Sequence, residues 1–358
     1  MAGILALDLG KNKSVSYFLQ SDREGTFDTH DTSPPTFHDL FVKIAPDVVV
    51  IEIGSIAGWV CDLCRALGIR VVVANTNDDR WVWRKVKRKT DRDDARKLGE
   101  MYRAGKLPLV HMPTREVRQW RSLIEYRTAL VRRRTAMRNT VHAILLREGR
   151  AMGAGGGAAW TQKRWRYLSE LSRPMEDCSA QELWRGMLAC ELQSMRHVEA
   201  LVDNVELKLD DLAAANESVQ LLRTIPGVGP RLSELVVAVI DDPKRFKNVR
   251  QVGAYAGLVP RQYESGQSSR QGRITGRGNP LLRGLLVEVS WLMRIHNPHF
   301  AQVFGKVERG TKARRKIAAV ATSRRLLITC WAMMRDRSAW RGPVKGRVDR
   351  EKSVKVLD

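Results

Sequence analysis

The run from Asp47 to Ile53, DVVVIEI, constrains the fold of this chain more than any other stretch. It is almost continuously apolar, as expected of a strand that is buried on both faces of a sheet. A helix is predicted to follow over residues 56–67, and a second buried strand over residues 70–74. This strand–helix–strand order implies parallel strands covered by helices, so the N-terminal part is predicted to be α/β.

Two acids are predicted to lie at strand ends. Residues 4–9 form an apolar run and residues 14–20 alternate apolar with polar side chains, so we expect a strand pair there, followed by a short helix over residues 36–44. Asp8 lies near the end of the first strand, and Glu52 near the end of the buried strand. A carboxylate in such a place is costly unless it is paired or binds a cation.

Two further acids lie in the segment TDRDDARKLG. Asp91 and Asp94 would share one face of a helix that Thr90 caps, with Asp93 behind it. Carboxylates that converge have to bind cations or stay protonated, and oxygen ligands favour Mg²⁺ or Mn²⁺. Two such ions about 4 Å apart would contact both the attacking and the leaving oxygen of a phosphoryl transfer. Each acid alone could equally be a surface charge or half of an ion pair.

The charge of the chain favours a polyanionic partner. Lys and Arg number 62 against 39 Asp and Glu, which gives a net charge of +23. Nucleic acid is therefore the first candidate partner and an anionic membrane the second. No apolar run reaches the roughly 20 residues of a spanning helix, and the N-terminus lacks the basic region of a signal peptide. We expect a cytoplasmic protein without a membrane partner.

The five cysteines do not form a disulfide or zinc pattern. Cys61 and Cys64 make one C-x-x-C, but no second pair or nearby histidine completes a zinc site. We interpret both as buried helix residues.

Residues 113–148 predict one or two long helices with an apolar stripe and a basic remainder. Because acids are scarce there, we expect the cations to follow a phosphate backbone. The predicted contacts are Arg118, Arg132, Arg133, Arg134 and Arg138. A glycine-rich run over residues 151–159 indicates a linker. Residues 160–167 interleave aromatic and basic side chains, which suits either stacking on bases or packing on a helix.

From residue 188 onward, apolar residues are spaced alternately three and four apart: Met195, Val198, Val202, Val205, Leu209 and Leu212. This is the spacing of a coiled-coil seam. The partner helix could belong to the same chain, but we favour a contact between two chains.

Residues 221–240, LLRTIPGVGPRLSELVVAVI, predict two helices joined by a Pro-Gly-Val-Gly-Pro turn. The layout is that of a helix-hairpin-helix, although a plain helical hairpin fits as well. In a helix-hairpin-helix, backbone N–H groups near Gly227 and Gly229 could contact a phosphate.

A basic amphipathic helix is predicted over residues 311–335. The cations Lys312, Arg314, Arg315 and Lys316 are expected to contact a nucleic-acid backbone. The residues expected to face inward are Ile317, Val320, Leu326, Leu327 and Trp331.

The stretch 257–280, GLVPRQYESGQSSRQGRITGRGNP, has no long apolar run and no helical period, so we expect a flexible loop. Its glycines allow the backbone to approach a ligand closely. The planar arginine side chain fits phosphate, and the arginines here are Arg261, Arg270, Arg273 and Arg277. The hydroxyl groups belong to Tyr263, Ser265, Ser268 and Ser269. Such a loop could bring a hydroxyl to a phosphodiester, and a solvated surface loop without chemistry is the simpler alternative.

These features together resemble known proteins. Asp8, Glu52 and the T-D-x-x-D-A segment with Asp91 and Asp94 are similar to the RuvC-like branch of the ribonuclease H fold. In that fold the first three strands are antiparallel and the later ones parallel. The segments IPGVGP, AYAGLVPRQYESG and GRITGRGNPLLR resemble the C-terminal domain of the DEDD insertion-sequence transposases. These are bridge-RNA-guided recombinases related to the pilin-gene invertases.

The resemblance covers most of the chain in the same order. Two departures stand out: Glu52 is followed by Ile-Gly-Ser where the family often has an E-A-T-G-like run, and residues 151–167 match no family pattern.

The resemblance implies a mechanism for the chain. Asp8, Glu52, Asp91 and Asp94 would form the metal-binding tetrad, and Ser265 would be the nucleophile. The expected activity is Mg²⁺-dependent recombination of donor and target DNA through a phosphoserine link. A dimer or tetramer would pair the serine with the tetrad of another protomer, and an RNA encoded by the element would specify both DNA sites.

Several alternatives remain open. Tyr263 would suit a tyrosine recombinase, which needs no carboxylate tetrad, and Ser268 and Ser269 lack the tyrosine and glycine context of Ser265. The chain could be a nuclease of the Holliday-junction-resolvase type, in which water attacks. It could also be a nucleic-acid-binding scaffold without activity.

The predicted organisation has four parts. An α/β RuvC-like domain over residues 1–150 precedes a linker and coiled coil over 151–215. A mainly α transposase domain with the helix-hairpin-helix-like motif follows over 216–340, and a polar tail over 341–358.

Overall fold

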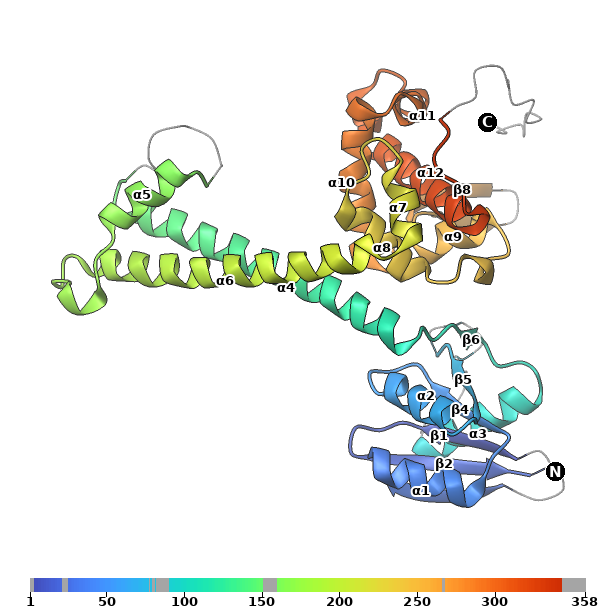
Figure 1. Cartoon of the computed structure of the whole chain (residues 1–358). Helices are drawn as coiled ribbons and strands as arrows, with labels where there is room; N and C mark the ends of the chain where they lie inside the picture. The colour runs from blue at the N-terminus through green and yellow to red at the C-terminus, as the bar shows by residue number, and fades with distance from the viewer. Residues whose placement is uncertain are drawn as a thin grey trace. The chain divides into compact units, whose positions relative to one another are not determined.

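The computed structural model describes residues 3–20, 25–76, 78, 81, 90–150, 160–265 and 268–342, with the backbone alone at 264, 265, 268, 269 and 271. The chain divides into two compact units, Met1–Arg118 and Gln119–Asp358 (Figure 1). The structural division falls inside a long helix, whereas the predicted domain boundary is at residue 150. The glycine-rich run over 151–159 and the tail from residue 343 lie outside the described residues.

Within the described residues, the first unit is a six-stranded sheet with helices on both faces (Figure 1). Its strands are β1 (Ile4–Asp8), β2 (Lys13–Leu19), β3 (Thr26–Asp31), β4 (Val48–Glu52), β5 (Arg70–Ala74) and β6 (Leu109–Val110). Its helices are α1 (Pro34–Ile44), α2 (Ala57–Ala66) and α3 (Asp91–Arg103).

The strand order is β3-β2-β1-β4-β5-β6. β1, β2 and β3 are antiparallel neighbours, whereas β4 and β5 continue the sheet parallel to β1. The short edge strand β6 is antiparallel to β5. The predicted α/β arrangement is therefore confirmed, with β1 and β4 at the centre. The strand β3 was not predicted, because its sequence, TFDTHD, is polar and largely exposed.

Each face of the sheet has its own core. The helices α1 and α2 pack on one face, against Leu5, Leu7, Val49 and Ile51. The helix α3 packs on the other face, against side chains that include Ala6, Val48 and Val50. Because strand side chains alternate between the faces, the two cores fix the direction of every residue on β1 and β4.

In the part of the second unit that the structure describes, one strand pair accompanies a set of helices. Its helices are α4 (Arg115–Arg147, which begins in the first unit), α5 (Gln162–Leu171), α6 (Leu183–Ala214), α7 (Glu217–Arg223), α8 (Pro230–Ile240), α9 (Val249–Tyr255), α10 (Pro280–His296), α11 (Pro298–Glu308) and α12 (Arg315–Asp336). Its strands are β7 (Pro260–Ser265) and β8 (Ser268–Ile274).

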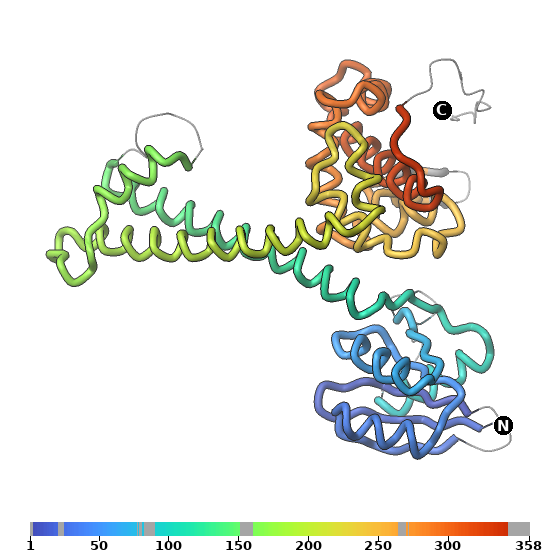
Figure 2. The backbone as a smooth tube through the Cα atoms, in the orientation of Figure 1, coloured from blue at the N-terminus to red at the C-terminus, as the bar shows by residue number. Residues whose placement is uncertain are grey.

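The helices α4 and α6 form an antiparallel pair, which Figure 2 shows side by side. Ion pairs join Arg127 to Glu206 and Arg138 to Glu199, so residues later in α4 meet residues earlier in α6. Near the N-terminus of α4, the Arg121 guanidinium donates to the carbonyl oxygens of Ala238 (2.6 Å) and Val239 at the end of α8.

The predicted seam on α6 is buried within the chain. Met195, Val198 and Val202 are at most 2% exposed, and they pack in clusters that contain Leu130, Val141 and Leu145 of α4. The prediction that this seam joins two chains is therefore wrong for these residues. The alternative, a pair of helices in one chain, is confirmed, because the apolar stripe of α4 supplies the partner.

The helix α12 lies in the core of the second unit. Leu326, Leu327 and Trp331 are buried there as predicted. Ile317 is 58% exposed, so the prediction that it faces inward is wrong. By length and composition, the described helical stretch Lys312–Asp336 could cross a membrane, but 56% of its most apolar window is buried within the protein. That burial is typical of a core helix in a folded domain.

A buried acid lies where α8 meets α4 and α6. Glu234 is 1% exposed, and within the described residues neither carboxylate oxygen accepts a hydrogen bond. Arg231 lies 3.4 Å from one oxygen, and Asp210, Arg127 and Glu206 are the other charged neighbours. Burial raises the pKa of Glu234 from 4.5 to about 7, and the attraction of Arg231 limits the rise.

This carboxyl group should make stability depend on pH. As pH rises above 4.5, the unfolded chain releases the proton first, so the folded state loses stability until pH passes about 7. Glu234→Gln should remove this loss. Its free energy of unfolding, relative to that of the wild type, should therefore rise by about 2 to 3 kcal/mol as the pH goes from 5 to 8. Urea unfolding of the second unit at both pH values measures the change.

The exposed Glu288 of α10 provides the matched control. Glu288→Gln should follow the wild type at both pH values. Equal pH dependence in the wild type and in Glu234→Gln would contradict the assignment.

Candidate functional site

Asp8 and Glu52 lie at the ends of two neighbouring parallel strands. In the pairing of β1 with β4, Ala6 is opposite Val50, and both side chains pack in the cluster beneath α3. Because strand side chains alternate, the residues two positions on, Asp8 and Glu52, share that face. Sheet geometry alone therefore brings two of the predicted acids together on the side that α3 covers.

The helix α3 adds a third acid to this face. Asp94 is 8% exposed and lies next to Ala95 and one turn before Leu98, both of which pack on the sheet. A Cβ built on Gly99 would be 3.4 Å from the Cβ of Ala6, so the helix lies directly over β1. Asp91, in contrast, is exposed at the first position of the helix.

A capping box fixes the start of α3. The Thr90 side chain accepts a hydrogen bond from the Asp93 backbone N–H (3.3 Å), and the Asp93 carboxylate accepts one from the Thr90 N–H (3.2 Å). The Thr90 hydroxyl also donates to that carboxylate and lowers the pKa of Asp93. The predicted cap is confirmed, and it fixes the positions of Asp91 and Asp94 at the start of the helix.

The donor set on this face suits a hard cation. Carboxylate oxygens from Asp8, Glu52 and Asp94 are the ligands that Mg²⁺ and Mn²⁺ prefer, and Asp91 lies one turn before Asp94. Within the described residues, however, no three His, Cys, Asp or Glu side chains converge into a ready ligand set. Binding of an ion would therefore have to draw these side chains together, and the metal site stays a prediction.

The two cysteines of the C-x-x-C are buried in α2, as predicted. Burial raises the pKa of Cys61 to about 11 and that of Cys64 to about 12. Both thus remain protonated at neutral pH, and a thiol is a poor metal ligand.

The predicted loop over 257–280 contains a β-hairpin, which corrects the sequence interpretation. The strands β7 and β8 pair antiparallel, with Tyr263 opposite Arg270 and Ser265 opposite Ser268. The backbone of Ser265 is therefore the last residue of β7. The strands carry mainly polar residues and so give no apolar alternation. The sequence signal was Gly266-Gln267, a two-residue connection with glycine first, as in a type II′ turn.

Close backbone contacts hold the base of this hairpin. Gly257 (φ +68°) and Gly278 (φ +99°) have backbone angles that favour glycine. A Cβ on Gly257 would overlap the carbonyl oxygen of Arg277, and one on Gly278 would overlap that of Tyr255. The end of α9 therefore lies against the segment that leaves β8, and this contact leaves no room for side chains.

The two helices and the turn predicted over 221–240 are present as α7 and α8. Gly227 takes φ +93° in the turn, and Gly229 is the residue before α8. The Asn297 side chain donates to the Pro226 carbonyl oxygen (3.1 Å), which fixes the turn from the side of α11. A phosphate contact by Gly227 and Gly229 stays a prediction.

The predicted nucleic-acid-binding arginines fall into two groups. Five have partners within the chain: Arg118 pairs with Asp62, Arg138 with Glu199 and Arg315 with Glu308, while Arg314 and Arg261 donate to the carbonyl oxygens of Val307 and Thr275. Five others are exposed and form no ion pair within the described residues: Arg132, Arg133, Arg270, Arg273 and Arg277. Arg134 is half-buried. The exposed group is the better candidate for phosphate contacts.

Sequence reasoning missed two further cations. Arg324 and Arg325 of α12 lie beside the hairpin and line a groove with it. Their only signal was the Arg-Arg pair in the middle of a helix otherwise predicted to be apolar on its inner face.

Two family models match separate parts of the chain. One family model, described as a transposase of the DEDD type, matches residues 5–148. A second, described as the transposase IS116/IS110/IS902 family, matches residues 219–304. A "Probable family 20 transposase" of Pseudomonas aeruginosa is 30% identical over 253 residues, which cover 70% of this chain and 72% of that protein.

The chain belongs to the IS116/IS110/IS902 family of transposases. It is also 31% identical over 199 residues to the "Transposase for insertion sequence element IS1111A" of Coxiella burnetii. This match covers 56% of the present chain and 53%, about half, of the length of that relative. The "Pilin gene-inverting protein" of Moraxella lacunata is 31% identical over 122 residues, 34% of this chain and 38% of that protein. The predicted relation to pilin-gene invertases is thus confirmed at the level of the family.

The packing of glycine at the base of the hairpin can be tested by substitution. Gly276→Ala should cost about 1 to 2 kcal/mol of unfolding free energy, because its φ of +64° disfavours alanine but no atom lies within 4 Å of the added Cβ. Gly257→Ala should cost at least about 2 kcal/mol more, because the Arg277 carbonyl must move. Urea unfolding of both variants measures the difference, and equal losses would show that the base is not closely packed.

Proposed function

We propose that the chain cuts and rejoins DNA as the recombinase of an insertion sequence, through a covalent link between Ser265 and a DNA strand. The observation that carries the proposal is that Asp8, Glu52 and Asp94 lie on one face of the sheet. This sheet lies within the segment that matches a family model of transposases. Asp8 and Glu52 are half-buried at the strand ends, beside the apolar cores.

The topology of the first unit supports a RuvC-like ribonuclease H fold. Three antiparallel strands, β1 to β3, are followed by β4 and β5, which extend the sheet parallel to β1. The resemblance noted in the sequence implies this same order. The acids Asp8, Glu52, Asp91 and Asp94 would then hold Mg²⁺ or Mn²⁺, which would neutralise charge at the scissile phosphate.

Ser265 would form the covalent link. Its Oγ would bond to the scissile phosphorus while the bond from phosphorus to the 3′-oxygen breaks. The serine proton would pass to solvent, and the leaving 3′-oxygen would take up a proton, so the strand keeps a free 3′-hydroxyl for rejoining. Nucleophilic serines need activation at neutral pH. The acids belong to the first unit and Ser265 to the second, so their meeting across two protomers of a dimer or tetramer is part of the proposal.

The covalent intermediate gives the most direct test of Ser265. With Mg²⁺ and a DNA substrate, the wild type should yield a protein–DNA adduct that survives a denaturing gel. Ser265→Ala should lower the adduct at least about a thousandfold, because no nucleophile remains. Glu52→Gln should lower it as strongly, because a cation ligand is lost.

Ser269→Ala is the matched control, since Ser269 lies on the opposite strand of the same hairpin. This variant should keep the adduct. If the wild type cuts DNA without forming an adduct, and Ser265→Ala cuts it equally well, the chain is a nuclease of the resolvase type in which water attacks. Absence of both products and of any effect of Mg²⁺ would favour a binding scaffold.

A guide RNA is the second partner in the proposal. The exposed Arg132 and Arg133 of α4 and the net charge of +23 provide a surface for RNA in addition to donor and target DNA. Purification of the chain from cells that carry its flanking genomic DNA should recover one discrete RNA from that flank. Arg132→Ala combined with Arg133→Ala should recover severalfold less, because phosphate contacts are lost.

Random cellular RNA, or none, would remove the guide from the proposal. The predicted roles of the acids and of Ser265 would then belong to a recombinase that reads DNA by protein contacts.

A further inference from the structure

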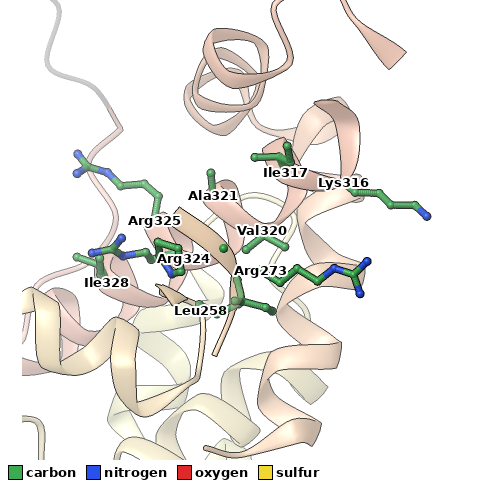
Figure 3. Close-up of a pocket in the computed structure, with 12 residues that line it drawn as sticks. Leu258, Arg273, Lys316, Ile317, Val320, Ala321, Arg324, Arg325 and Ile328 are labelled. Atoms are coloured by element: carbon green, nitrogen blue, oxygen red, sulfur yellow. The ribbon is translucent and has the colours of Figure 1, made fainter. Parts of the chain in front are cut away.

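A groove of about 1020 Å³ lies between the hairpin and the N-terminal half of α12 (Figure 3). Its apolar lining comes from Leu258, Pro260, Ile274, Val320, Ala321 and Ile328. Ile317 also lines it and is 58% exposed, although it belongs to a helix whose neighbouring residues, Ala318 and Ala319, are fully buried. The groove therefore presents apolar side chains to solvent in the middle of a basic surface.

Cations stand at both ends of this groove. Figure 3 shows Arg273 and Lys316 extending on one side and Arg324 and Arg325 on the other, with Val320 and Ala321 between them. No carboxylate is among the described residues that line the groove. Within the described part of the chain, none of the four cations takes part in an ion pair. A matching ligand is apolar in its middle and carries an anion on each side.

We propose that the groove binds an unpaired segment of a DNA strand. The face of a base would lie on the apolar lining, and the phosphates on either side of it would meet the two pairs of cations. Bases in a duplex are stacked and paired, so their faces cannot reach the lining without being extruded.

The lining also distinguishes DNA from RNA. Among the side chains that the structure describes, the lining contains no hydroxyl or amide group, and its polar side chains are the four cations. A buried 2′-hydroxyl would need a hydrogen-bond partner that the apolar centre does not supply. Deoxyribose buries no such group, and we therefore commit to DNA as the occupant.

This inference rests on the proposed function, because strand cleavage and exchange create unpaired DNA. The groove involves the hairpin that carries Ser265: Pro260, Gly272, Arg273 and Ile274, near the base of that hairpin, are part of its lining. An unpaired strand held there would be retained close to the hairpin while its partner is exchanged.

The test places a negative charge in the groove without disturbing the core. Ile317→Glu alters an exposed side chain of the groove, and Ile295→Glu alters an equally apolar side chain of α10, 75% exposed, as the control. Binding of the full chain to a fluorescent deoxythymidine oligonucleotide, the matching uridine oligonucleotide and a duplex of equal length is measured by anisotropy. Equal thermal unfolding of both variants establishes that they fold.

Ile317→Glu should weaken binding of the deoxythymidine strand by about tenfold or more and duplex binding by less than about threefold. Ile295→Glu should change neither. Lys316→Gln should also lower the salt dependence of single-strand binding by a slope of about 0.7, the value for one lost phosphate contact.

Three results would overturn the proposal: an equal loss for duplex and single strand, an equal loss for the uridine strand, or unchanged DNA binding with altered self-association in sedimentation. The last would identify a second copy of the chain as the occupant. Failure here leaves the Ser265 adduct unaffected, so the two proposals can be tested separately.

Discussion

The parallel pairing of β1 with β4 is the constraint on which the candidate site depends. Both strands are buried between two helical layers, and reversing their pleat would exchange the side chains of the two cores. Asp8 and Glu52 would then face the apolar core under α1 and α2, which is costly for a carboxylate. With the pleat fixed, the last residue of each strand has to face α3. The apolar cores thereby determine the direction of two carboxylates that are not themselves part of those cores.

In the second unit, backbone contacts of glycine, and not an apolar core, hold the hairpin that carries Ser265. A polar hairpin has little apolar surface with which to fix itself. Here the backbone of Gly257 lies against Arg277, and that of Gly278 against Tyr255, while the Thr275 N–H donates to the Val259 carbonyl oxygen (2.9 Å). Two glycines thus give the hairpin a rigid base on α9 and α10, and Ser265 extends from that base at the far end of β7.

Sequence reasoning succeeded where apolar pattern and local geometry agree. The buried strands follow from continuous apolar runs, and the cap at Thr90 and the turn between α7 and α8 follow from contacts within a few residues. It failed where the deciding contact is distant. A heptad seam on α6 predicts that a partner helix exists, but α4 could be recognised as that partner only in the folded chain. Polar strands such as β3 and β7 give no apolar period to detect.

The sequence also predicted more nucleic-acid-binding arginines than the structure leaves exposed. Arg138 and Arg315 form ion pairs that join helices of the second unit, so part of the basic character is structural. Their sequence context did not distinguish them from Arg132 or Arg273, which are exposed. Glu199, the partner of Arg138, lies far along the chain, and Glu308, the partner of Arg315, lies on the neighbouring helix. Only folding brings each pair into contact.

The central claim is that the carboxylates and Ser265 complete one active site from two protomers. Mixing the Ser265→Ala protein with the Glu52→Gln protein tests it most directly, because each variant supplies the group that the other lacks. The account predicts that the mixture forms the covalent DNA adduct while neither variant does alone. A mixture as inactive as its components, although the two proteins assemble together, would contradict a site shared between protomers.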